Sequence, residues 1–389
     1  MNILFLLKTY DLGGVEVVST VLAKKFIDSG HNVVVFAFEK GKGTALSYFK
    51  NIETIIGNGY INNKVNIVCL RNILLEKNIQ IVINQWGLPY LPIKILKKAS
   101  KGLDIKIIST HHNDPKANGL LKNLEFSIEN SKFYLFKILL KFKRKILKMV
   151  TSYSMRYVYK HSDRFLVLSN SYTQNFKSFT KIKCPSKLLV QTNPLTIDND
   201  NFVFNNADKE KEIIYVGRID YNQKRVYRII DTWKFLENKF TDWKLTIVGD
   251  GPEYKNIKKQ ITDYNLQRVS LEGFKKPIDY YKRASILLLT SEFEGFPLVL
   301  AECMNFGVIP AVYGSFSAVY DIIENNKDGL ICDYNKNGFP TQTMADKLSE
   351  IMLDVNKRNN MALNAIKKSK NYSIDNIYKS WEKLLNSLK

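Results

Sequence analysis

The stretch Ser291–Pro310, SEFEGFPLVLAECMNFGVIP, decides the fold, because it predicts a short buried helix between two strands of a parallel sheet. Pro297 suits the first helical turn, and Gly307 suits the left-handed cap at the other end. The residues between them are apolar on every side, which indicates a core helix. Glu294 and Glu302 flank or occupy this helix, and a buried carboxylate needs hydrogen-bond donors. Ligand hydroxyls would supply such donors; alternatively, Glu302 caps a neighbouring loop.

Short apolar runs alternate with helical stretches along the whole chain, which predicts an α/β fold with parallel sheets. A polar linker, Asp198–Lys211, separates two such series. We therefore expect two doubly wound, Rossmann-like domains, 1–195 and 196–372, followed by a docking helix in 373–389. Ligands of doubly wound sheets bind at the carboxyl ends of the strands, so the expected site faces a central cleft. The predicted strands are Ile3–Leu7, Val33–Phe38, Ile79–Ile83, Ile105–Ser109, Phe165–Leu168, Glu212–Val216, Lys244–Val248, Ile286–Leu289 and Val308–Val312.

The positive charge of the 389-residue chain, +21 in total, is concentrated in its first half. Residues 1–195 hold 30 Lys and Arg against 11 Asp and Glu, whereas residues 196–389 hold 28 against 26. This imbalance predicts that one domain meets an anionic surface. The four cysteines form no C-x2-C pair, which favours a reduced cytoplasm over a zinc or disulfide framework. The apolar run Asn2–Leu7 is too short for a signal peptide.

The stretch around the two glutamates resembles the E-x7-E signature of family four of the retaining glycosyltransferases, which have a GT-B fold. This resemblance covers nearly the whole chain and is most specific over 215–310. It implies that Glu294 holds a hydroxyl of the donor sugar and that Glu302 holds the nucleotide ribose. It also implies that the C-terminal helix crosses back to the first domain. The donor's phosphate and sugar oxygens would meet the backbone of Gly295, Phe296, Pro297 and Leu298.

Two cations follow the strand Glu212–Val216, in the arrangement Gly217-Arg218-x5-Lys224. This arrangement resembles the diphosphate clamp of the same family, and two cations can neutralise a leaving diphosphate. Arg225 departs from the family pattern, which commonly has Gly at that position. Two further blocks resemble the family's donor site: a turn with Gly249, and a segment near the nucleobase that includes Phe274.

In the first half, Gly13 and Gly14 open a helix after the first strand and match the family's G-G-x-E element, which faces the donor phosphates and the acceptor. His111 and His112 follow the strand Ile105–Ser109. The family places one histidine in this loop, near the donor sugar. The pattern favours His112 as the residue that orients and polarises, and leaves open which of the two faces the donor.

The resemblance implies transfer of a hexose or an N-acetylhexosamine from a nucleotide-diphosphate sugar, with a UDP-sugar favoured, to a membrane-linked glycan in surface polysaccharide biosynthesis. It implies no enzyme nucleophile. It also implies no bound metal, because Arg218, Lys224 and the helix start supply the positive potential that a metal would otherwise provide. Two alternatives remain open. One is a sugar-nucleotide epimerase or hydrolase on the same scaffold, and the other is a basic protein without enzyme activity that binds membranes or nucleic acid.

Lys132–Lys148 carries seven basic residues and no acidic one. The cations Lys137, Lys141, Arg144 and Lys148 recur at helical spacing opposite an apolar side, which is typical of a helix at an anionic membrane interface. We therefore expect a peripheral protein on the inner face of the plasma membrane, with no nucleic-acid partner. The alternative is a core-packed helix with a solvated basic face.

Overall fold

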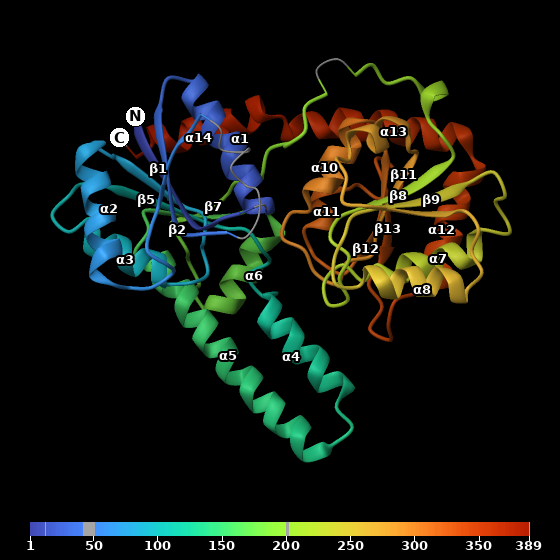
Figure 1. Ribbon diagram of the computed structural model, residues 1–389, viewed down its shortest axis with the longest axis horizontal. Coiled ribbons are helices and arrows are strands. Elements are labelled where there is room, and N and C mark those ends of the chain that lie inside the picture. Colours follow the sequence, from blue (N-terminus) through green and yellow to red (C-terminus); the bar gives the residue numbers. More distant parts are fainter. Residues whose placement is uncertain (12, 42–50, 200–201, 389) are drawn as a thin grey trace. The chain divides into compact units, whose positions relative to one another are not determined.

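The computed structural model describes residues 1–11, 13–41, 51–199 and 202–388 (Figure 1). Residues 200–201 of the predicted linker and residue 389 of the predicted last helix lie outside these ranges. The chain divides into two units, each with its own core. Unit 1 comprises Met1–Thr196 and Ile374–Lys389, and unit 2 comprises Ile197–Ser373.

Unit 1 contains a parallel sheet of seven described strands in the order β3-β2-β1-β4-β5-β6-β7. The order reverses between β1 and β4, which creates a switch point where helices diverge to opposite faces. Phe5 of β1 aligns with Val35 of β2 and Ile83 of β4, and all three are fully buried. The strands are β1 (Asn2–Tyr10), β2 (Asn32–Lys40), β3 (Glu53–Ile56), β4 (Ile81–Asn84), β5 (Lys106–His111), β6 (Arg164–Val167) and β7 (Leu188–Val190).

The last helix of the chain, α14 (Ile374–Asn386), packs against α1 (Gly14–Asp28) within unit 1. The ring of Phe26 contacts the rings of Tyr378 and Trp381 edge to face, with centroids 5.5 and 5.7 Å apart. Lys25 adds an ion pair to Asp375 at 2.6 Å. The C-terminal segment is therefore part of the unit 1 core.

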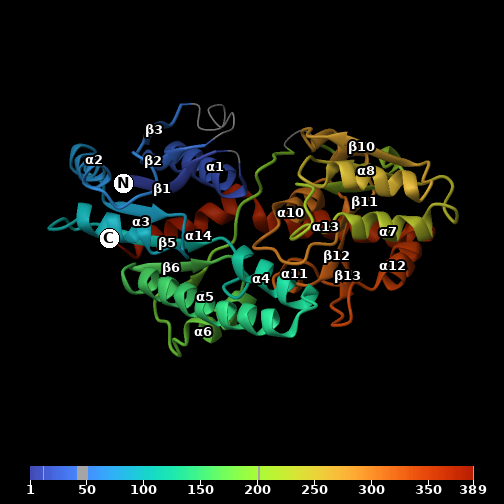
Figure 2. The ribbon, with the colours of Figure 1, turned by 60° about the horizontal axis from the view of Figure 1, so that its bottom comes forward.

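Helices α4 (Gly119–Asn130) and α5 (Tyr134–Lys160) form a hairpin that extends away from the sheet of unit 1 (Figures 1 and 2). Leu140 is buried, but much of the apolar side of α5 between 134 and 150 is exposed. This exposure contradicts a core-packed helix for that stretch. Within the described ranges, no helix combines the length and apolar character needed to cross a bilayer. The other helices of unit 1 are α2 (Lys64–Glu76), α3 (Leu91–Ala99) and α6 (Ser171–Thr180).

Unit 2 also contains a doubly wound parallel sheet, with six described strands in the order β10-β9-β8-β11-β12-β13. Its switch point lies between β8 and β11. The strands are β8 (Glu212–Val216), β9 (Lys244–Val248), β10 (Val269–Gly273), β11 (Ile286–Leu289), β12 (Ile309–Gly314) and β13 (Leu330–Asp333). The helices are α7 (Tyr227–Leu236), α8 (Tyr254–Asp263), α9 (Ile278–Arg283), α10 (Leu298–Asn305), α11 (Val319–Ile322), α12 (Thr341–Leu353) and α13 (Val355–Ser369). The predicted class, two doubly wound parallel sheets, is confirmed.

Candidate functional site

The switch point of unit 2 joins the loops that follow β8 and β11, and it brings Lys224 and Glu294 together. Lys224 Nζ lies 2.6 Å from Glu294 Oε1, and the two side chains are only 17% and 6% exposed. Ser291 Oγ donates a second hydrogen bond to the same oxygen at 2.7 Å. The carboxylate of Glu294 is thus held beside an ammonium group at the carboxyl end of the sheet.

Asp220 organises the loop that carries both predicted cations. Its Oδ1 accepts hydrogen bonds from the backbone N–H groups of Gln223 and Lys224, at 2.7 and 3.2 Å. Its Oδ2 accepts one from Arg218 Nε at 2.9 Å. The side chain of Arg218 is 64% exposed. The two cations therefore belong to one loop, with Lys224 half-buried against Glu294 and Arg218 directed to solvent.

The backbone conformation at Arg225 accounts for the glycine that the family commonly has at this position. Its φ is +53°, in the left-handed region that glycine adopts without steric cost. The arginine tolerates this conformation with its guanidinium 4.9 Å from the ring centroid of Tyr221. The same guanidinium lies 3.9 Å from Glu292. The left-handed backbone thus accounts for the family's glycine at this position. In this chain the arginine that replaces it contacts Tyr221 and Glu292.

Gly249 is required because the loops after β8 and β9 approach each other closely, whereas Gly217 adopts a φ of +150°, which residues with a side chain rarely allow. A Cβ atom on Gly249 would collide with the carbonyl oxygen of Gly217. The Gly249 N–H donates to the carbonyl of Gly273 at 2.8 Å, which links the β10 end to the same cluster. Phe274 follows directly and is 73% exposed. These loops form a glycine-lined edge with one exposed aromatic ring.

Helix α10 begins after Pro297 and ends where Gly307 adopts a φ of +70°. Pro297 has no N–H group, so Phe296 and Leu298 supply the backbone donors of the Phe296–Leu298 segment. Glu302, within α10, is buried and accepts a hydrogen bond from Tyr281 Oη at 3.2 Å. Burial and the neighbouring Glu302 carboxylate raise the pKa of Tyr281, so its hydroxyl remains a donor.

The switch point of unit 1 opens into a cavity of about 600 Å³ that contains both predicted histidines. His111 ends β5 and is buried, while His112 is half-buried. His112 Nε2 donates to Gln85 Oε1 at 2.7 Å, which leaves Nδ1 as the acceptor. Burial lowers the pKa of His111 to about 4, and burial together with His111 lowers that of His112 to about 3. Both imidazoles are therefore neutral near pH 7.

Several buried polar atoms around this cavity have no hydrogen-bond partner among the described residues. They include Gln85 Nε2, Trp86 Nε1 and His111 Nε2, all on side chains that line the cavity. Buried donors without partners are rare in proteins, and binding sites are one cause of them. The outer wall is apolar and includes Leu120 of α4 and Val150 of α5. The cavity thus combines unsatisfied donors with an apolar wall.

The predicted glycines of unit 1 lie at the start of α1, where Gly13 is the N-cap and Gly14 the first helical residue. A Cβ atom on Gly13 would meet the carboxylate of Glu16. Glu16 is buried, accepts a hydrogen bond from Thr9 at 3.4 Å, and has a raised pKa chiefly because of burial. Val15, between them, lines the cavity.

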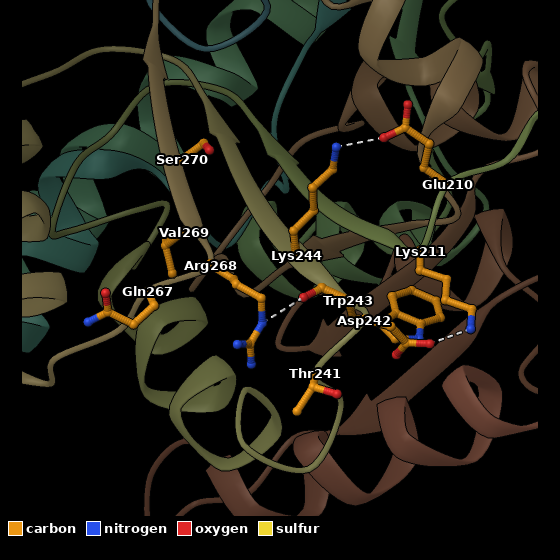
Figure 3. Close-up of a pocket in the computed structure, with 10 residues that line it drawn as sticks. All are labelled: Glu210, Lys211, Thr241, Asp242, Trp243, Lys244, Gln267, Arg268, Val269 and Ser270. Carbon is orange, nitrogen blue, oxygen red and sulfur yellow. Dashed lines mark hydrogen bonds and ion pairs between the residues drawn. The ribbon is translucent and has the colours of Figure 1, made fainter.

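A further pocket, of about 440 Å³, lies where β8, β9 and β10 begin (Figure 3). Four of its charged groups are paired with one another: Lys244 contacts Glu210 at 2.6 Å, and Lys211 pairs with Asp242. Arg268 donates to the backbone carbonyl of Trp243 at 3.2 Å. This pocket is at the amino ends of the strands, whereas ligands of such sheets bind at the carboxyl ends. We therefore assign it no part in the site.

Sequence reasoning missed Asp220, Ser291, Tyr281, Gln85 and Trp86. Four of them had a usable signal, because Asp220, Ser291, Gln85 and Trp86 lie within four residues of the carboxyl end of a strand. Tyr281 had none, since its partner Glu302 is 21 residues away along the chain.

Both halves of the chain match models of glycosyltransferase families. Residues 196–368 match "Glycosyl transferases group 1", and residues 12–188 match "Glycosyltransferase Family 4". These matches meet at the boundary between the two units and together span most of the chain.

Among curated proteins, the chain is 31% identical over 182 residues to the "Amylovoran biosynthesis glycosyltransferase AmsD" of Erwinia amylovora, which covers 46% of this chain and 49% of that protein. It is 24% identical over 100% of its length to a Campylobacter jejuni protein, spanning 99% of it. That protein is named "GalNAc-alpha-(1->4)-GalNAc-alpha-(1->3)-diNAcBac-PP-undecaprenol alpha-1,4-N-acetyl-D-galactosaminyltransferase".

A solved structure with the same fold is that of Anabaena Alr3699/HepE in complex with UDP. It aligns over 100% of both chains with a TM-score of 0.76 at 16% identity. Two matched family models, two doubly wound sheets and the E-x7-E segment agree. The chain belongs to the family-four type of GT-B glycosyltransferases.

Proposed function

We propose that this protein is a retaining glycosyltransferase that moves a hexose or an N-acetylhexosamine from a nucleotide-diphosphate sugar to a membrane-linked glycan. The observation that carries the proposal is the largely buried Lys224–Glu294 pair at the switch point of unit 2. A carboxylate held there can accept hydrogen bonds from sugar hydroxyls, and the ammonium beside it can neutralise a leaving diphosphate. The HepE complex with UDP favours UDP as the nucleotide.

In this proposal each described loop of unit 2 contacts a different part of the donor. Glu294 holds a sugar hydroxyl, and Lys224 and Arg218 contact the diphosphate together with the backbone at Gly217, Gly249 and Gly295–Leu298. Glu302 holds the ribose, and its hydrogen bond from Tyr281 fixes the carboxylate for that role. Phe274, exposed beside the glycine-lined edge, stacks on the base.

The reaction needs no enzyme nucleophile. The bond between the anomeric carbon and the diphosphate oxygen breaks, and the acceptor oxygen bonds to the same face of the sugar. The acceptor's proton passes to the leaving phosphate. His112, neutral and fixed in one tautomer by Gln85, orients the reacting hydroxyl without acting as an obligatory base.

The acceptor glycan binds, in this proposal, in the cavity of unit 1, where Gln85 Nε2 and Trp86 Nε1 are donors without partners and His111 Nε2 is a ring nitrogen without a partner. Sugar oxygens would satisfy these donors, and Gly13 and Gly14 border the same switch point. The name of the Campylobacter relative includes a diphosphate-undecaprenol acceptor, which supports a lipid-linked glycan as the acceptor class.

The protein works, in this proposal, at the inner face of the plasma membrane in surface polysaccharide synthesis, and needs no bound metal. Helix α5 supports membrane contact, because basic and large apolar side chains are exposed along it together. Arg144 takes a different role from the other predicted basic residues, since it forms an ion pair with Glu125 of α4.

The test is a screen of labelled nucleotide sugars, each incubated with and without a membrane fraction as the source of acceptor. We expect one donor to give a labelled product that extracts with lipid, and only when membranes are present. Release of free sugar at equal rates with and without membranes would indicate a hydrolase instead. No nucleotide-sugar binding at all would indicate a protein without this activity.

A further inference from the structure

A second cavity of unit 1, of about 530 Å³, lies against α5 and the end of α6. Four cations line it: Lys145, Lys148 and Arg156 from α5, and Lys181 from the residue after α6. We call these four residues and the apolar surface between them the basic groove. The α5 residues recur at helical spacing, so they face the same direction.

The charge of the basic groove is uncompensated. Its lining contains no acidic residue, and none of its four cations forms an ion pair with another described residue. Arg144, one residue from Lys145, shows the contrast, because its charge is met by Glu125 within the hairpin. A cluster of unpaired cations attracts an anionic group.

The groove is built by packing between two helices, which fixes the position of its fourth cation. Ser152 Oγ of α5 donates a buried hydrogen bond to the carbonyl of Phe179 in the last turn of α6, at 2.8 Å. Lys181 then ends α6 with a φ of +62°, and its N–H donates to the carbonyl of Lys177 at 2.9 Å. Lys181 is therefore held beside α5 by tertiary structure and not by its place in the sequence.

The apolar part of the groove indicates the kind of anion. Met149 and Tyr153 are 63% and 61% exposed and line the groove together with the cations and the buried Phe179. A nucleotide or inorganic phosphate would pair with the cations and leave this apolar surface in water. A lipid satisfies both parts, because its phosphate meets the cations and its acyl chain covers the apolar residues.

We propose that the basic groove binds the phosphate head group of an anionic phospholipid, with the start of an acyl chain against Met149 and Tyr153. This inference rests on the membrane contact proposed for α5 and makes it specific. A diffuse attraction depends on every exposed cation near the membrane. If the groove binds a head group, Lys181 and Arg156 contribute more to membrane binding than cations outside the groove do. Neither residue belongs to the basic run Lys132–Lys148.

The experiment measures cosedimentation of the full chain with phosphatidylcholine vesicles that contain phosphatidylglycerol, and with pure phosphatidylcholine vesicles. The test variants are K181G and R156Q. The matched controls are K183Q, two residues from Lys181, and K143Q on α5; both lysines are exposed and outside the groove. We expect each test variant to weaken binding to anionic vesicles about fivefold, from about 1 kcal/mol per cation, with smaller effects in the controls.

K181G also separates binding from folding. Glycine suits the left-handed backbone at this position, so the variant should keep or raise the free energy of unfolding while it loses a cation. Equal losses for K181G and K183Q would show diffuse attraction and overturn the groove. Displacement of the protein from vesicles by millimolar inorganic phosphate at constant ionic strength would also overturn it, because the site would then recognise phosphate alone.

Failure of this inference is distinct from failure of the proposed function. Binding of a UDP-sugar to the wild-type protein, measured without vesicles, tests the donor site alone. A wild type that binds the donor but ignores anionic vesicles would overturn the groove and leave the enzyme assignment standing.

Discussion

Lys224 and Glu294 are 70 residues apart in the sequence, yet their side chains form a largely buried ion pair of 2.6 Å. They meet because β8 and β11 are neighbours at the switch point of the sheet, so the loops that follow them share one edge. Each side chain therefore fixes the position of the other.

Replacement of either member of this pair by alanine should remove most of the transfer activity. Each substitution removes a charged hydrogen bond from a site with little water, a loss of about 2–4 kcal/mol, or a factor of tens to several hundred in rate. The measurement is kcat/KM for the donor in K224A and E294A. K258A on the exposed side of α8 is the control and should match the wild type. Activity within threefold of the wild type would remove the substituted residue from the site.

The contributions of Lys224 and Glu294 to the free energy of unfolding should be strongly coupled. K224M leaves the Glu294 carboxylate buried without its cation, which should lower the free energy of unfolding by about 3 kcal/mol. The double variant K224M/E294Q removes both charges and should recover most of that loss while transfer stays low. Urea denaturation of the wild type, both single variants and the double variant measures the coupling. Additive losses in the double variant would contradict a buried ion pair.

Removal of the Tyr281 hydroxyl should destabilise unit 2, because Tyr281 donates to the buried carboxylate of Glu302. We expect Y281F to lower the free energy of unfolding by about 1–3 kcal/mol, the cost of removing a buried donor to a carboxylate. Y280F is the matched control: it loses a hydrogen bond to Glu272, whose side chain is more exposed. An equal or larger loss in Y280F would contradict the argument from burial.

His111 should make the protein less stable as the pH falls. Its pKa in the folded state is about 4, lowered by burial, while an unfolded histidine titrates near 6.5. Between these values the unfolded state takes up a proton that the folded state does not, so stability is lost as the pH drops from about 7 towards 4. The loss is at most about 3 kcal/mol. Urea titrations at pH 7 and pH 5 should give a smaller difference for H111N than for the wild type; equal differences would refute the assignment.

Transfer should persist in the presence of a chelator. Lys224, Arg218 and the start of α10 supply the positive potential for the leaving diphosphate. The sequence has one Asp-x-Asp spacing, Asp198 to Asp200 in the linker, and Asp200 lies outside the described residues. The assay compares initial rates with and without EDTA. Activity that ends with chelator and returns with manganese or magnesium would show a metal requirement.

The strands show what local sequence predicts. The bounds of β8, β9 and β11 match the prediction, because these strands lie inside the sheet and are apolar along most of their length. The strands without a predicted counterpart, β3, β7, β10 and β13, are the outermost strands of their sheets. An edge strand has one neighbour and can be short or partly exposed, so its sequence carries a weaker apolar signal.

The sequence by itself determined the elements of the proposed donor site: the α10 segment with its two glutamates, the glycine turns and the cations after β8. These signals are local, since a cap, a turn or an apolar period depends on residues a few positions apart. Only the tertiary structure decided that Lys224 meets Glu294, that Tyr281 meets Glu302, and that Gln85 and His112 share a cavity. It also decided that Lys181 joins the α5 cations. Each of these contacts joins residues distant in the chain, and strand order and helix packing bring them together.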